Sequence, residues 1–378
     1  MYKLINLTIA VITLSFAHLG WAEKLPPPNL AVSAYALKDF NSGKLIANYN
    51  KDKQVEPASL TKIMTAYLVF EAIQNRHLKL SQTIPVSEKA WKMEGSKMFV
   101  EPNKPVTVDE LLHGLIIQSG NDAAVSLAEA VAGSEEQFAD LMNRKAAKFG
   151  MKSTHFMNST GMPDVQHYTT AADLSLLASA LIRDFPFEYK RLYSVKEYTY
   201  NKITQPNRNR LLWLDPNVDG MKTGHTESAG YCLISSAKRE DTRLVSIILG
   251  AVSEKSRAIE SQKLLNYGFQ AFETTLVYQK RQPINAIRVW KGSEDKISAT
   301  VAQNVYLSLP KGDYARVKAN MVSQEPLIAP IKANQVIGKI VFSLDGKVLS
   351  EEKLVAANDV ATGGFFSRMI DTVKLMLK

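Results

Sequence analysis

Ser59 and Lys62 are three residues apart, and a mostly apolar run from Ile63 to Phe70 follows them. A serine hydroxyl is a weak nucleophile that needs a neighbouring base to remove its proton. Residues i and i+3 of a helix are neighbours, and poor solvation among apolar side chains lowers the pKa of a lysine. A neutral Lys62 amine could therefore accept the Ser59 proton. Free backbone N–H groups at the start of the helix would favour a developing oxyanion.

The Ser-x-x-Lys spacing is not specific on its own. It occurs five times in the chain, at Ser59/Lys62, Ser235/Lys238, Ser293/Lys296, Ser308/Lys311 and Ser350/Lys353. Only the first of these continues into an apolar helix, and the other four end in polar or turn-like surroundings. The alternative interpretation of Lys62 is a surface lysine whose stem covers apolar neighbours while its charge reaches water.

A second group of polar residues, Ser119-Gly120-Asn121, interrupts an apolar helical region. Its hydroxyl could relay a proton to a leaving amine, and its carboxamide could hydrogen-bond a peptide substrate. A helix cap followed by a turn is the structural alternative.

A third group, Lys222-Thr223-Gly224, occurs once and stands just before an expected strand. A lysine and a hydroxyl at a strand edge can hold a carboxylate, and a glycine allows close approach of a substrate backbone. The structural alternative is an ordinary turn.

These groups must be positioned by a mixed set of helices and strands. A hairpin is expected over residues 32–48, and paired strands over 229–237 and 242–252. Helices are expected over residues 59–74, 135–149, 171–183 and 255–272, with two helical runs broken at 118–121 within 109–132. This order predicts an antiparallel sheet whose first and last strands lie together, with helices packed on it.

The pattern of apolar and turn residues changes towards the end of the chain. Short strand-like segments separated by turn residues predict a small all-β domain over residues 279–362. In residues 363–378, a helical wheel places most of the apolar side chains in one sector of the helix, namely Phe365, Phe366, Met369, Ile370, Val373, Met376 and Leu377, with Leu375 at its edge. Such a helix is too short to cross a bilayer but suits its surface. Docking on its own domain is the alternative.

The first residues and the composition indicate where the protein works. Residues 1–22 have the layout of a signal peptide cleaved after Ala22, although an uncleaved membrane anchor is the alternative. The net charge of +9 is spread without a dense basic run, so nucleic acid is the least favoured anionic partner. Cys232 is the only cysteine, which excludes an internal disulfide, and we interpret it as a buried core residue.

The three groups, taken together and in this order, resemble the signature of class A β-lactamases and penicillin-binding proteins. The stretches "ASLTKIMTAY", "SGNDAA" and "VDGMKTGHT" look most like the low-molecular-mass penicillin-binding proteins that act as serine-type D-alanyl-D-alanine carboxypeptidases. Glycine replaces the aspartate of the general signature at position 120, as is common in that group.

The resemblance implies a fold class, α/β (α+β), and a division of the chain. A signal peptide (1–22) would precede a β-lactamase/transpeptidase-like domain with an antiparallel sheet and helices (23–278). A small all-β domain (279–362) and a C-terminal amphipathic membrane-anchor helix (363–378) would follow.

The resemblance also implies residue roles. The catalytic residues would be Ser59 as the acylated nucleophile, Lys62 as its base, and Ser119. The substrate-binding residues would be Asn121, Lys222, Thr223, Gly224, His225 and Arg257, and Asp173 would be a structural acid below the site. No cofactor or metal is expected.

The expected substrate is the peptidoglycan stem pentapeptide, from which the enzyme would remove the terminal D-alanine. β-Lactams would act as covalent inhibitors, and the C-terminal helix would hold the enzyme at the periplasmic face of the inner membrane, with no nucleic acid involved.

Other functions fit the residues less well. A class A β-lactamase uses a loop glutamate to activate water, and the chain has no glutamate between Glu136 and Glu188. A non-catalytic wall-binding protein would not need the intact Ser59 and Lys62. The chain has no Gly-x-Ser-x-Gly elbow, which argues against a Ser-His-Asp hydrolase. No two histidines have the spacing of zinc ligands, which argues against a zinc peptidase.

Overall fold

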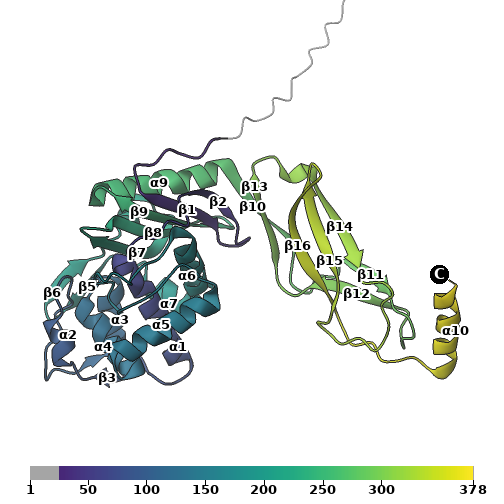
Figure 1. Cartoon of the computed structure of the whole chain (residues 1–378), viewed down its shortest axis with the longest axis horizontal. Coiled ribbons are helices and arrows are strands. Elements are labelled where there is room, and N and C mark those ends of the chain that lie inside the picture. The colour runs from purple at the N-terminus through teal and green to yellow at the C-terminus, as the bar shows by residue number, and fades with distance from the viewer. Residues whose placement is uncertain (1–24, 378) are drawn as a thin grey trace, which may run out of the picture.

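The computed structural model describes residues 25–377, in which a helix-rich part built on one sheet is followed by a β-rich part and a terminal helix. Figure 1 shows the two parts side by side, with the terminal helix at the far end of the β-rich part. The expected signal peptide, residues 1–22, lies outside the described residues.

The first part is organised on a five-stranded antiparallel sheet. Its spatial order is β2 (Leu45–Tyr49), β1 (Ala34–Asp39), β9 (Thr242–Ala251), β8 (Gly230–Arg239) and β7 (Val218–Thr226). The first strand therefore pairs with the last, with Ala34 opposite Leu249. This confirms the arrangement expected from the order of the elements, and it leaves β7 at one edge of the sheet.

Side-chain alternation along β1 separates two hydrophobic cores. Ala34 and Ala36 belong to the core shared with the helical region, whereas Tyr35 and Leu37 belong to the core under α9 (Glu254–Ala271). This is the two-residue period of a strand that is covered on both faces. The alternation therefore fixes which face of the sheet meets which helices.

The short α8 (Leu211–Leu214) lies on the same side of the sheet as α9, since Leu211 and Leu212 belong to the core under α9. The helices on the opposite side are α1 (Lys62–Gln74), α2 (Glu88–Lys92), α3 (Val108–Ile116), α4 (Asn121–Ala132), α5 (Glu135–Phe149), α6 (Ala171–Asp184) and α7 (Pro186–Leu192). Short two-stranded sheets, β3 (Thr83–Ile84) with β4 (Val106–Thr107) and β5 (Glu197–Tyr200) with β6 (Ile203–Pro206), lie between them. Side-chain caps explain where several helices begin: Thr107 forms a capping box with Glu110, and Ser134 and Thr170 cap α5 and α6.

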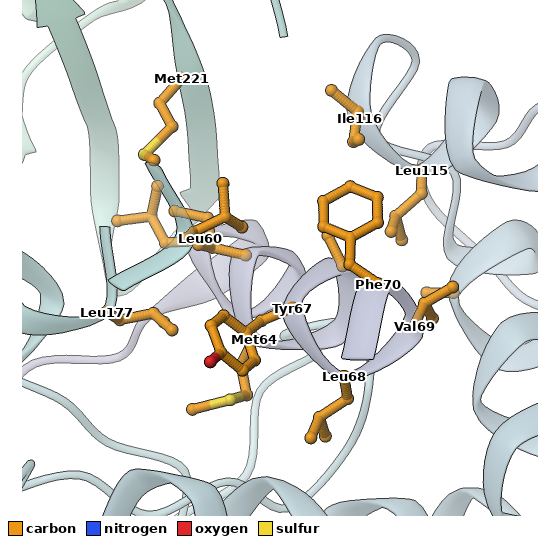
Figure 2. Packing of buried hydrophobic residues seen from close by; sticks show 14 of the residues in the cluster. Leu60, Met64, Tyr67, Leu68, Val69, Phe70, Leu115, Ile116, Leu177 and Met221 are labelled. Carbon is orange, nitrogen blue, oxygen red and sulfur yellow. The ribbon is translucent and has the colours of Figure 1, made fainter. Parts of the chain in front are cut away.

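Helix α1 is the most deeply buried of these elements; Lys62 is its first residue, and Ser59 lies in the turn just before it. Figure 2 shows Leu115 and Ile116 on the side of Phe70, and Met221 above Leu60. Since α1 contacts both the helices and, through the turn before it, strand β7, it fixes where its first residues lie relative to the edge of the sheet.

The second part is almost entirely β-structure. Strand β10 (Phe272–Tyr278) pairs with β13 (Val305–Pro310), and a five-stranded antiparallel sheet has the order β11 (Asn285–Arg288), β12 (Lys296–Val301), β16 (Lys347–Ala356), β15 (Val336–Leu344) and β14 (Val317–Ser323). It has a separate hydrophobic core that includes Val305, Phe342 and Leu354. This confirms the expected all-β character of the region.

The terminal helix α10 (Phe365–Met376) keeps its apolar side chains exposed. Its contact with the rest of the chain is polar, because the Lys291 backbone N–H donates to Asp371 Oδ2 at 2.6 Å. None of the helices within residues 25–377 is long and apolar enough to cross a membrane.

Candidate active site

Ser59 and Lys62 lie next to each other at the junction of two helical segments. Ser59 is in a 3₁₀ turn, Ala58–Thr61, and Lys62 is the first residue of α1. Because a 3₁₀ helix has about three residues per turn, side chains at i and i+3 eclipse one another. Lys62 Nζ lies 3.0 Å from Ser59 Oγ. The sequence predicted a continuous helix here, and the tighter turn brings the pair together more directly.

The Lys62 amine is buried and has three polar neighbours. Its side chain is 1% exposed, and Nζ lies 2.6 Å from both Asn121 Oδ1 and the Thr160 carbonyl oxygen. Burial lowers its pKa to about 7, an effect that the Asp122 carboxylate opposes and the Arg208 charge reinforces. Lys62 is therefore not the solvated surface lysine of the alternative interpretation.

The three neighbours also orient the amine. The Asn121 amide oxygen and the Thr160 carbonyl oxygen can only accept hydrogen bonds, whereas the Ser59 hydroxyl can also donate one. A neutral amine has two N–H donors and one lone pair. When two N–H groups bind the two acceptors, the lone pair faces the Ser59 hydroxyl. The arrangement can therefore remove a proton from Ser59.

Ser119 and Lys222 form a second hydroxyl–amine pair. Ser119 follows α3 with a φ of 61°, and its Oγ lies 2.8 Å from Lys222 Nζ, which also donates to the Thr223 carbonyl oxygen at 2.9 Å. Burial lowers the pKa of Lys222 well below its ordinary value, with further contributions from Lys62, Arg208 and Arg257. The site therefore holds two buried amines, each beside a serine.

Strand β7 carries the third motif along the edge of the sheet. A Cβ at Gly224 would lie 3.2 Å from the Pro57 carbonyl oxygen and from the Leu60 backbone N. The strand therefore runs against the turn that holds Ser59, and only a residue without a side chain fits there comfortably. An edge strand also leaves backbone N–H and C=O groups available to an extended ligand.

His225 and Arg257 lie near the two pairs but are not hydrogen-bonded to them within residues 25–377. Both contact Tyr231: the His225 ring centroid is 4.0 Å from that of Tyr231, and the Arg257 guanidinium lies 5.6 Å from the same ring. Arg257 also donates to the Arg208 carbonyl oxygen at 3.3 Å. Arg257 is thus held on α9 behind β8, at the side of the site where its charge acts on Lys222.

Two residues near the site were not singled out from the sequence. Arg208 is exposed, its Nε lies 3.4 Å from the Gln118 carbonyl oxygen, and its charge lowers the pKa of both Lys62 and Lys222. Asp122 is buried and accepts hydrogen bonds from the backbone N–H groups of residues 98, 99 and 100. Asp122 could have been found from the sequence, because it directly follows Asn121 of the second motif. Arg208 could not, because it belongs to none of the three motifs.

Two further expectations concern residues outside the polar pairs. Asp173 accepts from the Ser153 backbone N–H and from Thr154 Oγ1, which is a structural arrangement at the start of α6. Cys232 is buried, and burial raises the pKa of its thiol to about 11. No cluster of histidine, cysteine or carboxylate side chains suited to a metal ion is present among residues 25–377.

Comparison with known proteins supports one family. Residues 22–253 match the family described as D-alanyl-D-alanine carboxypeptidase, and residues 272–362 match the C-terminal domain of penicillin-binding protein 5. The D-alanyl-D-alanine carboxypeptidase DacC of Escherichia coli K12 is 43% identical over 361 residues, which cover 93% of this chain and 90% of DacC.

Solved structures agree with this result. Penicillin-binding protein 5 from Haemophilus influenzae is 40% identical and superposes with a TM-score of 0.85, covering 89% of this chain and 99% of that protein. Penicillin-binding protein D2 from Listeria monocytogenes in its ampicillin-bound form is 32% identical, with a TM-score of 0.60 over 65% of this chain and all of that chain. The chain belongs to the D-alanyl-D-alanine carboxypeptidase family of the penicillin-binding proteins. Its activity is therefore that of a D-alanyl-D-alanine carboxypeptidase.

Proposed function

We propose that Ser59 is the nucleophile of this carboxypeptidase and that Lys62 is its base. The supporting observation is the distance of 3.0 Å between Ser59 Oγ and a Lys62 amine whose pKa burial lowers to about 7. The Ser59 proton passes to Lys62 Nζ while Oγ bonds to the carbonyl carbon of the penultimate D-alanine. The bond to the terminal D-alanine then breaks, which leaves an ester on Ser59.

The second hydroxyl–amine pair serves the leaving group. A departing amine needs a proton, and the Ser119 hydroxyl, 2.8 Å from Lys222 Nζ, can supply one and be reprotonated by that lysine. Water then attacks the ester carbonyl: its hydroxyl bonds to that carbon, and the bond to Ser59 Oγ breaks. Ser59 Oγ takes back the proton that Lys62 holds, and the proton from water restores Lys222. The products are D-alanine and the shortened stem peptide.

Substrate binding is assigned to Asn121 and to the residues of β7 and α9 that follow the second pair. Asn121 offers a buried carboxamide beside Lys62. Lys222, Thr223, Gly224 and His225 continue along β7, the edge strand of the sheet, where an extended peptide can add as a strand. Arg257 gives this end a positive charge that suits the terminal carboxylate of a stem pentapeptide, and Lys222 adds to that charge when it is protonated.

β-Lactams react at the same serine in this proposal. The ampicillin-bound relative supports binding of such compounds, and Ser59 is the hydroxyl that the site activates. No glutamate lies between residues 136 and 188, the region where a class A β-lactamase has its water-activating glutamate. The penicilloyl ester is therefore hydrolysed slowly, and penicillin inhibits the enzyme.

We further propose that the enzyme works at the periplasmic face of the inner membrane. Residues 1–22 read as an export signal, and helix α10 exposes Phe365, Phe366, Ile370 and Met376. An apolar face of this size on a short helix suits insertion into a membrane surface. Its only acid, Asp371, is used to contact the Lys291 backbone. On this view residues 23–278 form the peptidase, 279–362 a spacer domain and 363–378 the anchor.

Mass spectrometry of the penicillin adduct tests the assignment of the nucleophile. The purified protein is incubated with benzylpenicillin, digested, and searched for the serine that carries the added mass. We expect the adduct on the peptide that contains Ser59, and neither adduct nor D-alanine release from Ser59→Ala. A Ser256→Ala variant, altered at a half-buried serine of α9, is the matched control and should keep both. An adduct on any other serine refutes the assignment.

A further inference from the structure

A cavity of about 430 Å³ lies where the peptidase part meets the β-rich part, away from the Ser59 pair. In Figure 1 this is the region between strands β1 and β2 and the start of the β-rich part. Both parts of the chain supply polar residues to its lining, which include Lys38, Asn41 and Arg183 from the first part and Lys280, Asn304 and Tyr306 from the second.

Lys38 is the unusual member of this lining. It lies on β1 on the same face as Ala34 and Ala36, directed to the side where α6 packs, and its residue surface is only 7% exposed. Within the described residues its ammonium group has no hydrogen bond and no ion pair. Burial lowers the pKa of Lys38, and the nearby Arg183 lowers it further. A mostly buried ammonium group that faces this cavity and has no acidic partner is poorly solvated, so this position favours a bound anion.

The other two cations increase the positive potential of the cavity. Arg183 lies in the last turn of α6 and donates to both carboxylate oxygens of Asp184, at 2.8 and 3.1 Å. Lys280 is exposed, and its ammonium group has no acidic partner among residues 25–377. Asp184 thus offsets Arg183, and the positive charges of Lys38 and Lys280 are left without a carboxylate.

Neutral donors complete the lining. Asn41 Nδ2 donates one of its two hydrogens to the Asp241 carbonyl oxygen, which leaves the other free. Tyr306 Oη accepts from Asn304 Nδ2 at 3.5 Å, so its own hydroxyl hydrogen remains available. The negative end of the α6 dipole opposes an anion here, but it amounts to only about half a charge against two unpaired ammonium groups.

We propose that this cavity binds a phosphate group. Two unpaired ammonium charges match a group whose own charge is about −1.5 to −2 at pH 7, and amide and phenol donors suit its several acceptor oxygens. A membrane lipid is a poor source of the phosphate, because α10 lies at the opposite end of the β-rich part (Figure 1). The source is instead free phosphate or a phosphate ester on a water-soluble molecule or wall polymer.

Because both parts of the chain supply ligands, binding joins them. A ligand that binds only the folded, docked arrangement raises the thermal midpoint in proportion to the logarithm of its concentration. The site is separate from the Ser59 pair, so its effect is on the orientation and stability of the two parts and not on bond cleavage.

The test is a titration of the full chain with inorganic phosphate at constant ionic strength, with chloride as the balancing salt. Broadening of the ³¹P resonance reports binding directly, and the thermal midpoint reports linkage. We expect saturable broadening and a rising midpoint for the natural chain, and loss of both effects in Lys38→Gln. Lys318→Gln removes the same charge from an exposed position on β14 and should behave like the natural chain.

Lys280→Gln is a second test variant, needed in case the buried Lys38→Gln substitution impairs folding. Lys280 is exposed, so its substitution leaves the fold intact and should weaken phosphate binding by at least tenfold. A second titration with glycerol 3-phosphate distinguishes the sources: tighter binding than inorganic phosphate identifies an ester, and weaker binding identifies the free ion. Absence of saturable binding to the natural chain overturns the proposal. So does binding that is equal in the natural chain, Lys38→Gln and Lys280→Gln.

Discussion

The rate of acylation should follow the protonation of Lys62 near neutral pH. With the ordinary pKa of 10.5, only about one lysine in 3,000 would be neutral at pH 7, whereas a pKa of about 7 makes about one in two neutral. Burial therefore multiplies the available base about a thousandfold. This population factor corresponds to at most about 4 kcal/mol of activation free energy, because an amine with a lower pKa is also a weaker base.

The sign of the pH dependence follows from which form is active. In the proposed mechanism the neutral amine accepts the Ser59 proton, so protonation of Lys62 removes the base. The second-order rate constant for benzylpenicillin acylation should fall about tenfold for each pH unit below about 6 and level off above about 8. Stopped-flow mixing with a fluorescent penicillin from pH 5 to pH 9 measures this profile.

Arg208→Gln provides the perturbation that links the profile to this lysine. The Arg208 charge helps to lower the pKa of Lys62, so its removal should move the midpoint of the profile to higher pH. Arg210→Gln removes the same charge two residues away, where Arg210 stacks near Trp213, and should leave the midpoint unchanged. A flat profile between pH 5.5 and 8, or the same midpoint in all three proteins, would refute the assignment of Lys62 as the base.

Three other predictions concern stability and attachment. Burial lowers the pKa of His167 from 6.5 to about 4. Between these two pH values the unfolded chain binds a proton at this histidine and the folded chain does not. The free energy of unfolding should therefore fall by up to about 3 kcal/mol as the pH drops from about 6.5 to about 4. In denaturant titrations over this range, His167→Gln should lose less stability than His77→Gln, the control at an exposed histidine. Gly161→Ala should lower the free energy of unfolding by about 2 kcal/mol or more and slow acylation, because its Cβ would lie 1.8 Å from the Ala58 carbonyl oxygen. Gly150→Ala, at a similar φ but with open space around the Cβ, should lower it by only about 1 kcal/mol. Equal losses of stability in chemical denaturation would contradict the steric argument. Deletion of 363–378 should abolish sedimentation with anionic vesicles and keep D-alanine release, and continued sedimentation would show that the anchor lies elsewhere.

The sequence was informative wherever local periodicity determines structure. The i, i+3 spacing predicted that Ser59 and Lys62 share one side of a helical segment, and their 3.0 Å contact agrees with that prediction. The order of the elements, with strands first, helices in the middle and strands again, likewise predicted a sheet whose first strand pairs with its last. The first prediction needed only residues that are neighbours in the sequence, and the second needed only the order of the elements that such local patterns define.

Contacts that depend on distant loops could not be predicted. The Thr160 carbonyl oxygen reaches Lys62 from 98 residues away in the chain, and no pattern in the sequence marks a backbone oxygen. Arg208 acts on both amines through its charge, although the nearby sequence shows only a polar stretch. The left-handed backbone of Ala58, with a φ of 46°, also lies outside what helix periodicity describes. Such features arise from tertiary packing around the site.

The helix at the C-terminus illustrates a third case. The helical wheel predicted its apolar face, and the structure leaves that face exposed while Asp371 contacts Lys291. An exposed apolar face, however, does not by itself identify what covers it, and this is why vesicle binding needs its own experiment.

Direct titration of the Lys62 amine tests the central claim most closely. The protein is prepared with ¹³C-labelled lysine, the Lys62 side-chain resonance is assigned by its loss in Lys62→Met, and its chemical shift is followed from pH 5 to pH 11. We predict a midpoint near 7, with the neutral form predominating above it. A midpoint near 10.5 would mean that the buried amine is charged at neutral pH and cannot take the proton from Ser59.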